Sequence, residues 1–273
     1  MTGLERQLFA EKVWQYYAEH GRDLPWRLPT VGDRFDAYRI MLSEIMLQQT
    51  QVNRVIPKYH EFLERFPDIR ALAAAPLHDV LIVWSGLGYN RRAKFLHQAA
   101  RQTMDEFDGI LPDDQRLLTT LPGIGHNTAG AIVAYAYNRP AIFIETNIRT
   151  VYIHHFFNDA TDVTDAQIRA CLGETVDADE PRQWYWALMD YGSHLKATTG
   201  NAAQRSKSYT RQSKFEGSRR QIRGKVLAGL TQGPLSLDQL SVEIPDARLE
   251  SVLSDLVSEG MLIESAETYQ LAA

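Results

Sequence analysis

The sequence predicts an all-α protein that ends in a small domain with a short β-hairpin. Apolar residues recur at the 3.6-residue spacing of helices in several segments before residue 200. Turns rich in glycine and proline separate these segments. After Arg220 the pattern changes to short helices followed by two β-like stretches. We therefore expect a helical part over residues 1–218 and a separate domain over residues 219–273.

Composition excludes several classes of protein. No apolar run approaches the ~20 residues that a membrane helix needs, and the N-terminus lacks a secretory signal. A single cysteine, Cys171, rules out an internal disulfide and a four-cysteine metal site. A cytoplasmic, nucleoid-associated protein fits these features.

Charge is distributed unevenly along the chain. The net charge is −5, yet residues 206–225 carry +6 and residues 226–273 carry −7. A nucleic-acid partner is therefore compatible with the chain only if it meets local basic residues rather than the whole surface.

The N-terminal helix is expected over residues 5–20. Its predicted core positions are Leu8, Phe9, Val13, Trp14 and Tyr17. The motif Arg22-Asp-Leu-Pro-Trp-Arg27 follows, and its plain interpretation is a proline turn anchored by a buried Trp26.

A buried helix carrying one acid is expected within residues 38–52. The segment is apolar on nearly all sides, and Glu44 interrupts it. A carboxylate on a buried helix is costly unless it is paired or stays protonated. Glu44 is therefore either a structural ion-pair partner or a general acid. The polar run at residues 48–51 ends this helix, and an amphipathic helix is expected over residues 52–66.

Two glycine turns precede helices further along. Residues 84–94 combine a tight glycine turn with a basic helix start. Residues 113–120 predict a short helix, residues 121–128 a Pro-Gly-Ile-Gly hairpin, and residues 129–138 a buried helix. The exposed amides after Gly125 could bind a phosphate, although the same pattern fits a plain helix–helix corner.

An acid, an amide and a cation follow the apolar run at residues 141–144. They are Glu145, Asn147 and Arg149. Glu145 is either an acid favoured by a helix N-terminus or a carboxylate that acts on a nucleotide beside the hairpin.

Residues 5–200 resemble a known family. The hairpin sequence L-P-G-I-G-x-x-T-A-G-A-I, with a downstream acid-x-N-x-x-x-V, resembles the helix-hairpin-helix DNA glycosylases of base excision repair. The motifs R-D-L-P-W-R, L-S-E-I-M-L-Q-Q-T-Q-V and A-L-M-D-x-G are similar to those of its adenine glycosylase branch, the MutY type. The resemblance implies two all-α lobes, about residues 30–138 and residues 1–29 with 139–218, and an active site in the cleft between them.

The resemblance implies a catalytic role for three residues. Glu44 would protonate the departing base, Glu145 would stabilise the sugar cation, and Asn147 would orient that carboxylate. The family has aspartate where this chain has Glu145, and the extra methylene shifts the carboxylate by roughly an ångström.

The resemblance also implies which residues meet the substrate. The expected DNA-binding residues are Gln48, Gln49, Thr50, Leu87, Tyr89, Arg91, Gly123, Gly125, His126, Asn127 and Thr128. The expected base pocket consists of Arg22, Trp26 and Asn127. The glutamines would fill the gap left by a flipped base, and Leu87 and Tyr89 would wedge into the duplex. Arg92 and Lys94, beside Arg91, would also face phosphates, unless these charges are simply solvated.

The expected cofactor content departs from the MutY pattern. That pattern has four cysteines for an iron–sulfur cluster, but residues 193–213 contain none, so no cluster is expected. The resemblance leaves room for a monovalent cation at the hairpin. Endonuclease III-type relatives with strand-cleaving activity have a lysine where this chain has Asn127, which predicts a monofunctional enzyme with weak or no AP lyase activity.

The C-terminal domain is expected to resemble a winged helix. A helix at residues 222–230, a Ser236–Gln239 capping box, a third helix and a β-hairpin occur in that order. Its negative charge favours packing or a protein partner over a second DNA contact. The adenine glycosylases that the chain resembles normally carry a different C-terminal domain, which checks for 8-oxoguanine, and that domain is not expected here. The protein is expected to be a monomer.

Three functions are compatible with these features. The first is removal of adenine opposite 8-oxoguanine or guanine in double-stranded DNA. The second is removal of thymine, uracil or a modified base, which Glu145 and the different C-terminal domain favour. The third is non-catalytic DNA binding on the same fold.

Overall fold

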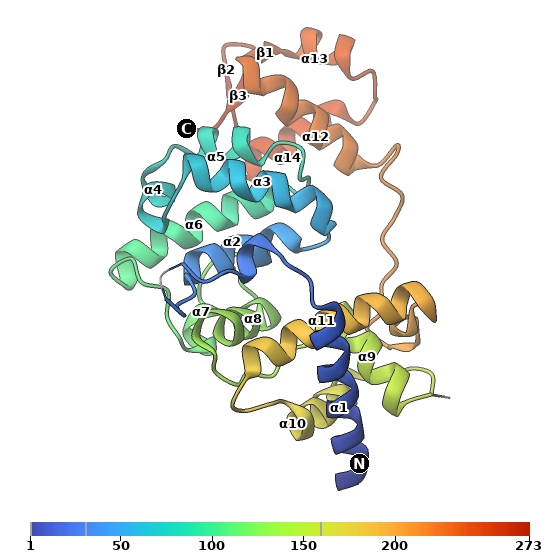
Figure 1. Ribbon diagram of the computed structural model, residues 1–273. Coiled ribbons are helices and arrows are strands. Elements are labelled where there is room, and N and C mark those ends of the chain that lie inside the picture. Colours follow the sequence, from blue (N-terminus) through green and yellow to red (C-terminus); the bar gives the residue numbers. More distant parts are fainter. Residues whose placement is uncertain (1, 31, 159) are drawn as a thin grey trace. The chain divides into compact units, whose positions relative to one another are not determined.

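The computed structural model describes residues 2–30, 32–158 and 160–273 (Figure 1). It is mostly helical with a small C-terminal sheet, as the sequence predicts. The elements are α1 (Gly3–His20), η1 (Pro25–Arg27), α2 (Ala37–Leu47), α3 (Val52–Arg65), α4 (Ile69–Ala74), α5 (Leu77–Trp84), α6 (Arg91–Glu106), α7 (Gln115–Leu118), α8 (His126–Tyr137), α9 (Thr146–Phe156), α10 (Asp165–Thr175), α11 (Pro181–Thr198), η2 (Ala202–Arg205), α12 (Arg219–Gly229), η3 (Leu230–Gln232), β1 (Leu235–Ser236), α13 (Leu237–Glu243), α14 (Leu249–Ser258), β2 (Leu262–Ser265) and β3 (Thr268–Leu271). Within the described ranges, no helix is both long and apolar enough to cross a membrane.

The chain divides into two compact units. Unit 1 comprises Met1–Met41, Pro112–Thr120 and Ile124–Arg211; unit 2 comprises Leu42–Leu111, Leu121–Gly123 and Gln212–Ala273. The C-terminal segment thus groups with the central helices, a division that differs from the boundaries expected from sequence. Those boundaries remain a prediction.

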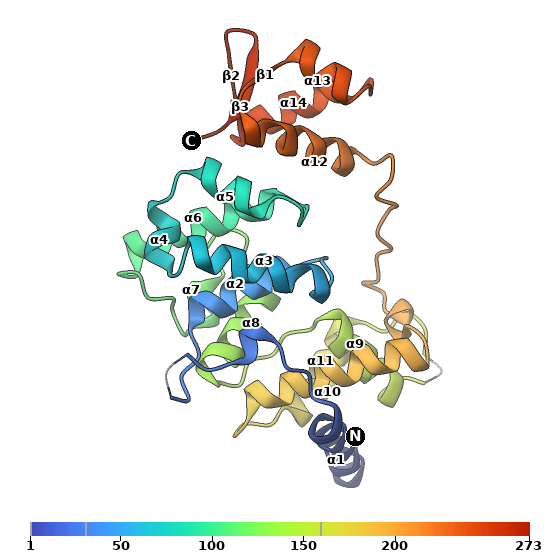
Figure 2. The ribbon, with the colours of Figure 1, turned by 45° about the horizontal axis from the view of Figure 1, so that its top comes forward.

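Unit 1 is built around α11, which packs against α1, α8 and α9 (Figures 1 and 2). Three consecutive aromatic residues, Trp184–Trp186, are buried because neighbouring helices cover several sides of α11. The Tyr185 ring stacks on Phe143 with centroids 4.1 Å apart, and Trp184 meets Phe9 of α1 edge-on. The predicted burial of Phe9 is confirmed, whereas the predicted burial of Leu8 is wrong because its side chain is 57% exposed.

Gly192 permits the close approach of α9 and α11. A Cβ at this position would lie 2.3 Å from the Asn147 carbonyl oxygen, which no side chain tolerates. The glycine of the A-L-M-D-x-G motif is therefore a packing residue that sets the position of α9 and of the residues at its start.

Asp190 holds the N-terminal segment against α11. Its carboxylate accepts hydrogen bonds from the Arg22 backbone N–H (2.8 Å) and Nε (2.7 Å), and from both terminal nitrogens of Arg27 at 2.8 Å. Burial alone would raise the pKa of Asp190, but the hydrogen bonds and charges of Arg27 and Arg22 outweigh it and lower this pKa. Arg22 and Arg27 of the R-D-L-P-W-R motif thus bind Asp190 of the A-L-M-D-x-G motif, and we call this contact the clamp.

Unit 2 contains a helical core and the C-terminal domain. Helices α4 and α5 pack on α6, and Trp84 at the end of α5 is fully buried. The polar residues 48–51 separate α2 from α3, as the sequence predicts.

The C-terminal domain has the predicted winged-helix order (Figure 2). Ser236 and Gln239 form the expected capping box at the start of α13. Strands β1, β3 and β2 form an antiparallel sheet in that spatial order, and Ala266 and Glu267 turn the β2–β3 hairpin with left-handed backbone angles. Helix α14 packs on α12 and β2.

Asp190→Asn should destabilise the protein by about 3 kcal/mol near neutral pH, because it leaves the buried guanidinium of Arg27 without its partner charge. Urea unfolding followed by circular dichroism would measure this. Since the native pKa of Asp190 is lowered, the carboxylate stabilises the fold above its ordinary pKa of 3.8, and the difference between variant and wild type should shrink as the pH falls below that value.

Asp113→Asn is the matched control, because Asp113 pairs with Arg139 on the exposed surface of the same unit. Its cost should stay below about 1 kcal/mol. Equal costs for the two variants would contradict the clamp.

Candidate nucleic-acid interface and catalytic carboxylates

Glu44 lies on α2 among buried neighbours. Ser43 and Ile45 on either side of it are buried, whereas Glu44 itself is partly exposed. Glu44 therefore lies at the edge of the core of unit 2 with part of its surface accessible, as a general acid that meets a substrate requires.

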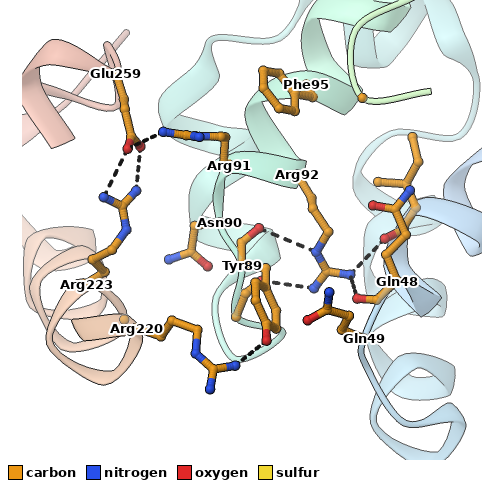
Figure 3. Close-up of a pocket in the computed structure, with 14 residues that line it drawn as sticks. Gln48, Gln49, Tyr89, Asn90, Arg91, Arg92, Phe95, Arg220, Arg223 and Glu259 are labelled. Carbon is orange, nitrogen blue, oxygen red and sulfur yellow. Dashed lines mark hydrogen bonds and ion pairs between the residues drawn. The ribbon is translucent and has the colours of Figure 1, made fainter. Parts of the chain in front are cut away.

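Arg92, at the start of α6, joins two turns of unit 2 (Figure 3). Its guanidinium donates to the carbonyl oxygens of Ile45, Met46 and Gln48 at 2.7–2.8 Å. It also donates to the Thr50 hydroxyl and the Gly88 carbonyl, each at 3.0 Å. The turn after Glu44 and the glycine turn before α6 are thus held by one side chain.

The sequence did not predict this role. Arg92 was expected to face phosphates, but its residue is only 8% exposed, so it is a structural cation. It lies over the rings of Trp84 and Tyr89 at 5.2 and 5.5 Å, and burial lowers its pKa to about 10. One signal was available: the last turn of α2 contains no basic residue, so its free carbonyls need a donor from elsewhere.

Two residues of these turns have an uncommon backbone conformation. Gln49 and Tyr89 adopt left-handed φ angles of 56° and 48°. Such angles cost roughly 1–3 kcal/mol in non-glycine residues and cluster at functional sites. Gln49 is exposed and Tyr89 partly exposed, so both can meet a ligand. Leu87 is 3% exposed, which corrects its predicted role as a wedge, because a wedge must reach the duplex from the surface.

A cavity of about 520 Å³ lies beside these turns within unit 2 (Figure 3). It is lined by Ile45, Gln48, Gln49, Gly88, Tyr89, Asn90, Arg91, Arg92, Phe95, Gly123, Arg220, Arg223, Gly224 and Glu259. Arg91, predicted to bind DNA, forms an ion pair with Glu259 at 2.6 Å. The Lys94 ammonium donates to the Glu259 carbonyl, so neither cation is simply solvated.

The hairpin has the predicted form of helix, glycine turn and helix. Asp114 caps α7 by accepting the N–H groups of Arg116 and Leu117. Gly123 has a φ of +77°, and a Cβ there would lie 2.7 Å from the Phe95 Cβ, so glycine is required. Gly125, the N-cap of α8, has open space around it. His126 and Asn127 are exposed, and Thr128 is partly exposed. This first turn of α8 is thus accessible to a phosphate oxygen.

Asn127 links the hairpin to the segment before Glu145. Its Oδ1 accepts a hydrogen bond from the Ile144 backbone N–H at 3.2 Å. Glu145 follows directly as the partly exposed N-cap residue of α9. Two residues later, the Asn147 side chain donates to the Met189 carbonyl of α11 at 3.2 Å. The start of α9 is therefore held from both α8 and α11.

Two residues expected in the base pocket have structural roles. Arg22 is bound to Asp190, and Trp26 is 5% exposed within the clamp segment. Asn127 is exposed, although its side-chain oxygen accepts a hydrogen bond from the Ile144 backbone N–H. Within the described ranges, no group of three or more His, Cys, Asp or Glu side chains could hold a metal ion.

Comparison with known proteins identifies the family. Residues 42–176 match the HhH-GPD superfamily of base excision DNA repair proteins. The adenine DNA glycosylase of Mycolicibacterium smegmatis is 34% identical over 94% of this chain and 93% of its own length. The chain belongs to the HhH-GPD superfamily.

Other relatives match over shorter stretches. The adenine DNA glycosylase of Buchnera aphidicola (subspecies Baizongia pistaciae) is 35% identical over 68% of this chain, which spans about half (52%) of that relative. Among solved structures, a thermostable thymine-DNA glycosylase matches with a TM-score of 0.63 and 21% identity over 72% of this chain and 90% of its own. An endonuclease III–DNA complex matches with a TM-score of 0.59 and 18% identity over 72% and 89%. These structures confirm the predicted fold.

Arg92→Lys should destabilise the protein by about 3 kcal/mol, because lysine keeps the charge but cannot donate to both turns at once. The midpoint of urea unfolding would measure this. Arg101→Lys is the control on the same helix, where the arginine is exposed, and it should cost less than about 0.5 kcal/mol. An Arg92→Lys variant with the unfolding midpoint of the wild type would show that the two turns do not depend on this guanidinium.

Proposed function

We propose that this protein is a monofunctional adenine DNA glycosylase that excises adenine opposite 8-oxoguanine or guanine. The observation that carries the proposal is Glu44, placed at the partly exposed edge of a buried helix within the L-S-E-I-M-L-Q-Q-T-Q-V motif. The adenine DNA glycosylases named among the relatives support the choice of base. The substrate is double-stranded DNA, and the protein acts as a cytoplasmic monomer at the nucleoid.

The reaction breaks the bond between the sugar and the base. Glu44 donates a proton to the departing adenine, which leaves as a neutral base with the electrons of the glycosidic bond. The carboxylate of Glu145 stabilises the positive charge that develops on the sugar. Water then adds to the anomeric carbon, and the proton that it loses restores the acid form of Glu44. Asn147, fixed to α11, restricts the start of α9 and so the position of Glu145.

DNA contacts come from the two turns and the hairpin. Gln48, Gln49 and Thr50 face the space left by the flipped adenine, and Tyr89 inserts its ring to offset the unstacking. The amides of Gly125 to Thr128 bind a backbone phosphate, as their accessibility allows.

Residue types at the hairpin and before the C-terminal domain also limit the proposed chemistry. Asn127 occupies the position where strand-cleaving relatives have lysine, so no Schiff base forms and AP lyase activity is weak or absent. No iron–sulfur cluster is expected. A monovalent cation at the hairpin fits the resemblance. The acidic C-terminal domain is suited to a protein partner.

Glu145 favours a second candidate. The longer side chain at this position could mark a different base, so excision of mismatched thymine, uracil or a modified base is the alternative. The third candidate is DNA binding without base excision.

The test is single-turnover excision from labelled duplexes with A opposite 8-oxoguanine, A opposite G, T opposite G and U opposite G. Abasic sites would be scored by alkali cleavage. We expect cleavage at adenine, reduced at least about 10²-fold by Glu44→Gln and unchanged by Glu64→Gln, which alters an exposed acid on α3. Cleavage only at a pyrimidine would select the second candidate, and binding without product would leave the third.

Two variants of Glu145 distinguish the effect of its negative charge from the effect of its side-chain length: Glu145→Asp keeps the charge, and Glu145→Gln keeps the length. Because a negative charge beside the sugar is the requirement, the aspartate variant should keep excision within about tenfold of wild type, while the glutamine variant should lose at least about 10²-fold. The same single-turnover assay measures both. Equal activity of the two variants would remove the carboxylate from the mechanism.

A further inference from the structure

The hydroxyl of Tyr89 is bound by the C-terminal part of unit 2. Both the Gln212 amide and the Arg220 guanidinium donate to it (Figure 3 shows the Arg220 bond). The Arg220 guanidinium also lies over the Tyr89 ring, 5.2 Å from its centroid, and donates to the Ser213 carbonyl at 2.7 Å. Arg92 lies over the same ring at 5.5 Å. The tyrosine thus meets two guanidinium groups, one fixed in the core and one supplied by α12.

Neighbouring residues expected to meet DNA are bound by the same segment. Gln212 donates to the side-chain oxygen of Gln49 at 3.3 Å. The Glu259 carboxylate accepts from Arg91 at 2.6 Å and from Arg223 of α12 at 2.5 Å. Its backbone carbonyl accepts from Lys94.

The charge of the C-terminal domain matches this arrangement. Residues 226–273 carry −7, and Glu259 places one of these charges where a phosphate would meet Arg91. Burial alone would raise the pKa of Glu259, but hydrogen bonds from Arg223 and Arg91 outweigh it and lower this pKa, so the carboxylate is charged at neutral pH.

We propose that Gln212, Arg220 and Glu259 form an intramolecular latch on the DNA-facing residues Gln49, Tyr89 and Arg91, so that DNA and the C-terminal domain compete for one surface. The inference rests on the proposed function, because that function assigns these three residues to DNA. In the latched state the domain is an autoinhibitor, and a duplex must displace it before Tyr89 can insert.

The competition follows from the contacts of the ring. A wedge enters the duplex with the outer end of its ring first, and in Tyr89 that end is the hydroxyl bound by Gln212 and Arg220. Arg92 is buried and bound to several carbonyl oxygens, so it cannot move aside. Arg220 is held by fewer bonds and lies on the separate helix α12. Release of Arg220, together with Gln212, is therefore the step that frees the tyrosine.

Arg220→Ala gives the sharpest test, because the latch and simple electrostatics predict opposite signs. Removing a cation should weaken binding to DNA. Opening a latch should instead tighten it, by about fivefold in Kd for an undamaged duplex, since more molecules are in the binding-competent state. Fluorescence anisotropy at fixed salt measures this. Lys225→Ala removes one exposed charge from the same helix and should leave Kd unchanged or slightly raised.

A double-mutant cycle with Tyr89→Phe identifies the contact. Phenylalanine keeps the ring for stacking but lacks the hydroxyl that accepts from Gln212 and Arg220. We expect Tyr89→Phe to tighten binding, and the double variant to bind no more tightly than Arg220→Ala, because both changes open the same latch. Amide exchange in α12 should also rise when duplex is added to the wild-type protein.

An Arg220→Ala variant that binds DNA as weakly as Lys225→Ala, or more weakly, would overturn the latch and make Arg220 a DNA contact. Greater protection of α12 on DNA binding would do the same. Failure of the proposed function is distinguishable from failure of the latch: no base is then excised by wild type or by any variant, whatever the order of their Kd values.

Discussion

The arrangement of unit 2 depends on one buried guanidinium. Arg92 satisfies the carbonyl groups that α2 leaves free at its end and binds the glycine turn before α6 through a second set of bonds. Unpaired buried carbonyls are costly, so this side chain makes the two turns one rigid surface. The strained positions Gln49 and Tyr89 lie on that surface, which is able to sustain their left-handed backbone angles.

In unit 1, close packing between helices positions the start of α9. Gly192 lets α9 approach α11, Asn147 is bound to the α11 backbone, and Asn127 of α8 binds the residue before Glu145. The start of α9 is thus restricted by α11 through two contacts and by α8 through one. The backbone at Glu145 is therefore positioned by contacts with both helices, and a preorganised position is what the proposed role of Glu145 requires.

Features with local signals were predictable from sequence. The hairpin, the buried helix around Glu44, the Ser236–Gln239 capping box and the winged-helix order each depend on residues close in the chain. The partners of Arg22, Arg91 and Arg92 were not predictable, because they lie far away in sequence and an arginine that binds DNA has the same local pattern as one that binds a carboxylate. The burial of Leu87 was missed for the same reason: a glycine turn does not reveal which of its side chains points inward.

The proposed function requires that the turns joined by Arg92 face a duplex from which adenine is extruded. The most direct measurement uses 2-aminopurine, a fluorescent adenine analogue, opposite 8-oxoguanine, titrated with the catalytically disabled Glu44→Gln variant. Unstacking of the analogue raises its fluorescence, so we expect an increase that saturates with binding and is lost in Glu44→Gln/Tyr89→Ala. Binding seen by anisotropy without any rise in fluorescence would contradict the proposed function, since the protein would then hold DNA without flipping the base.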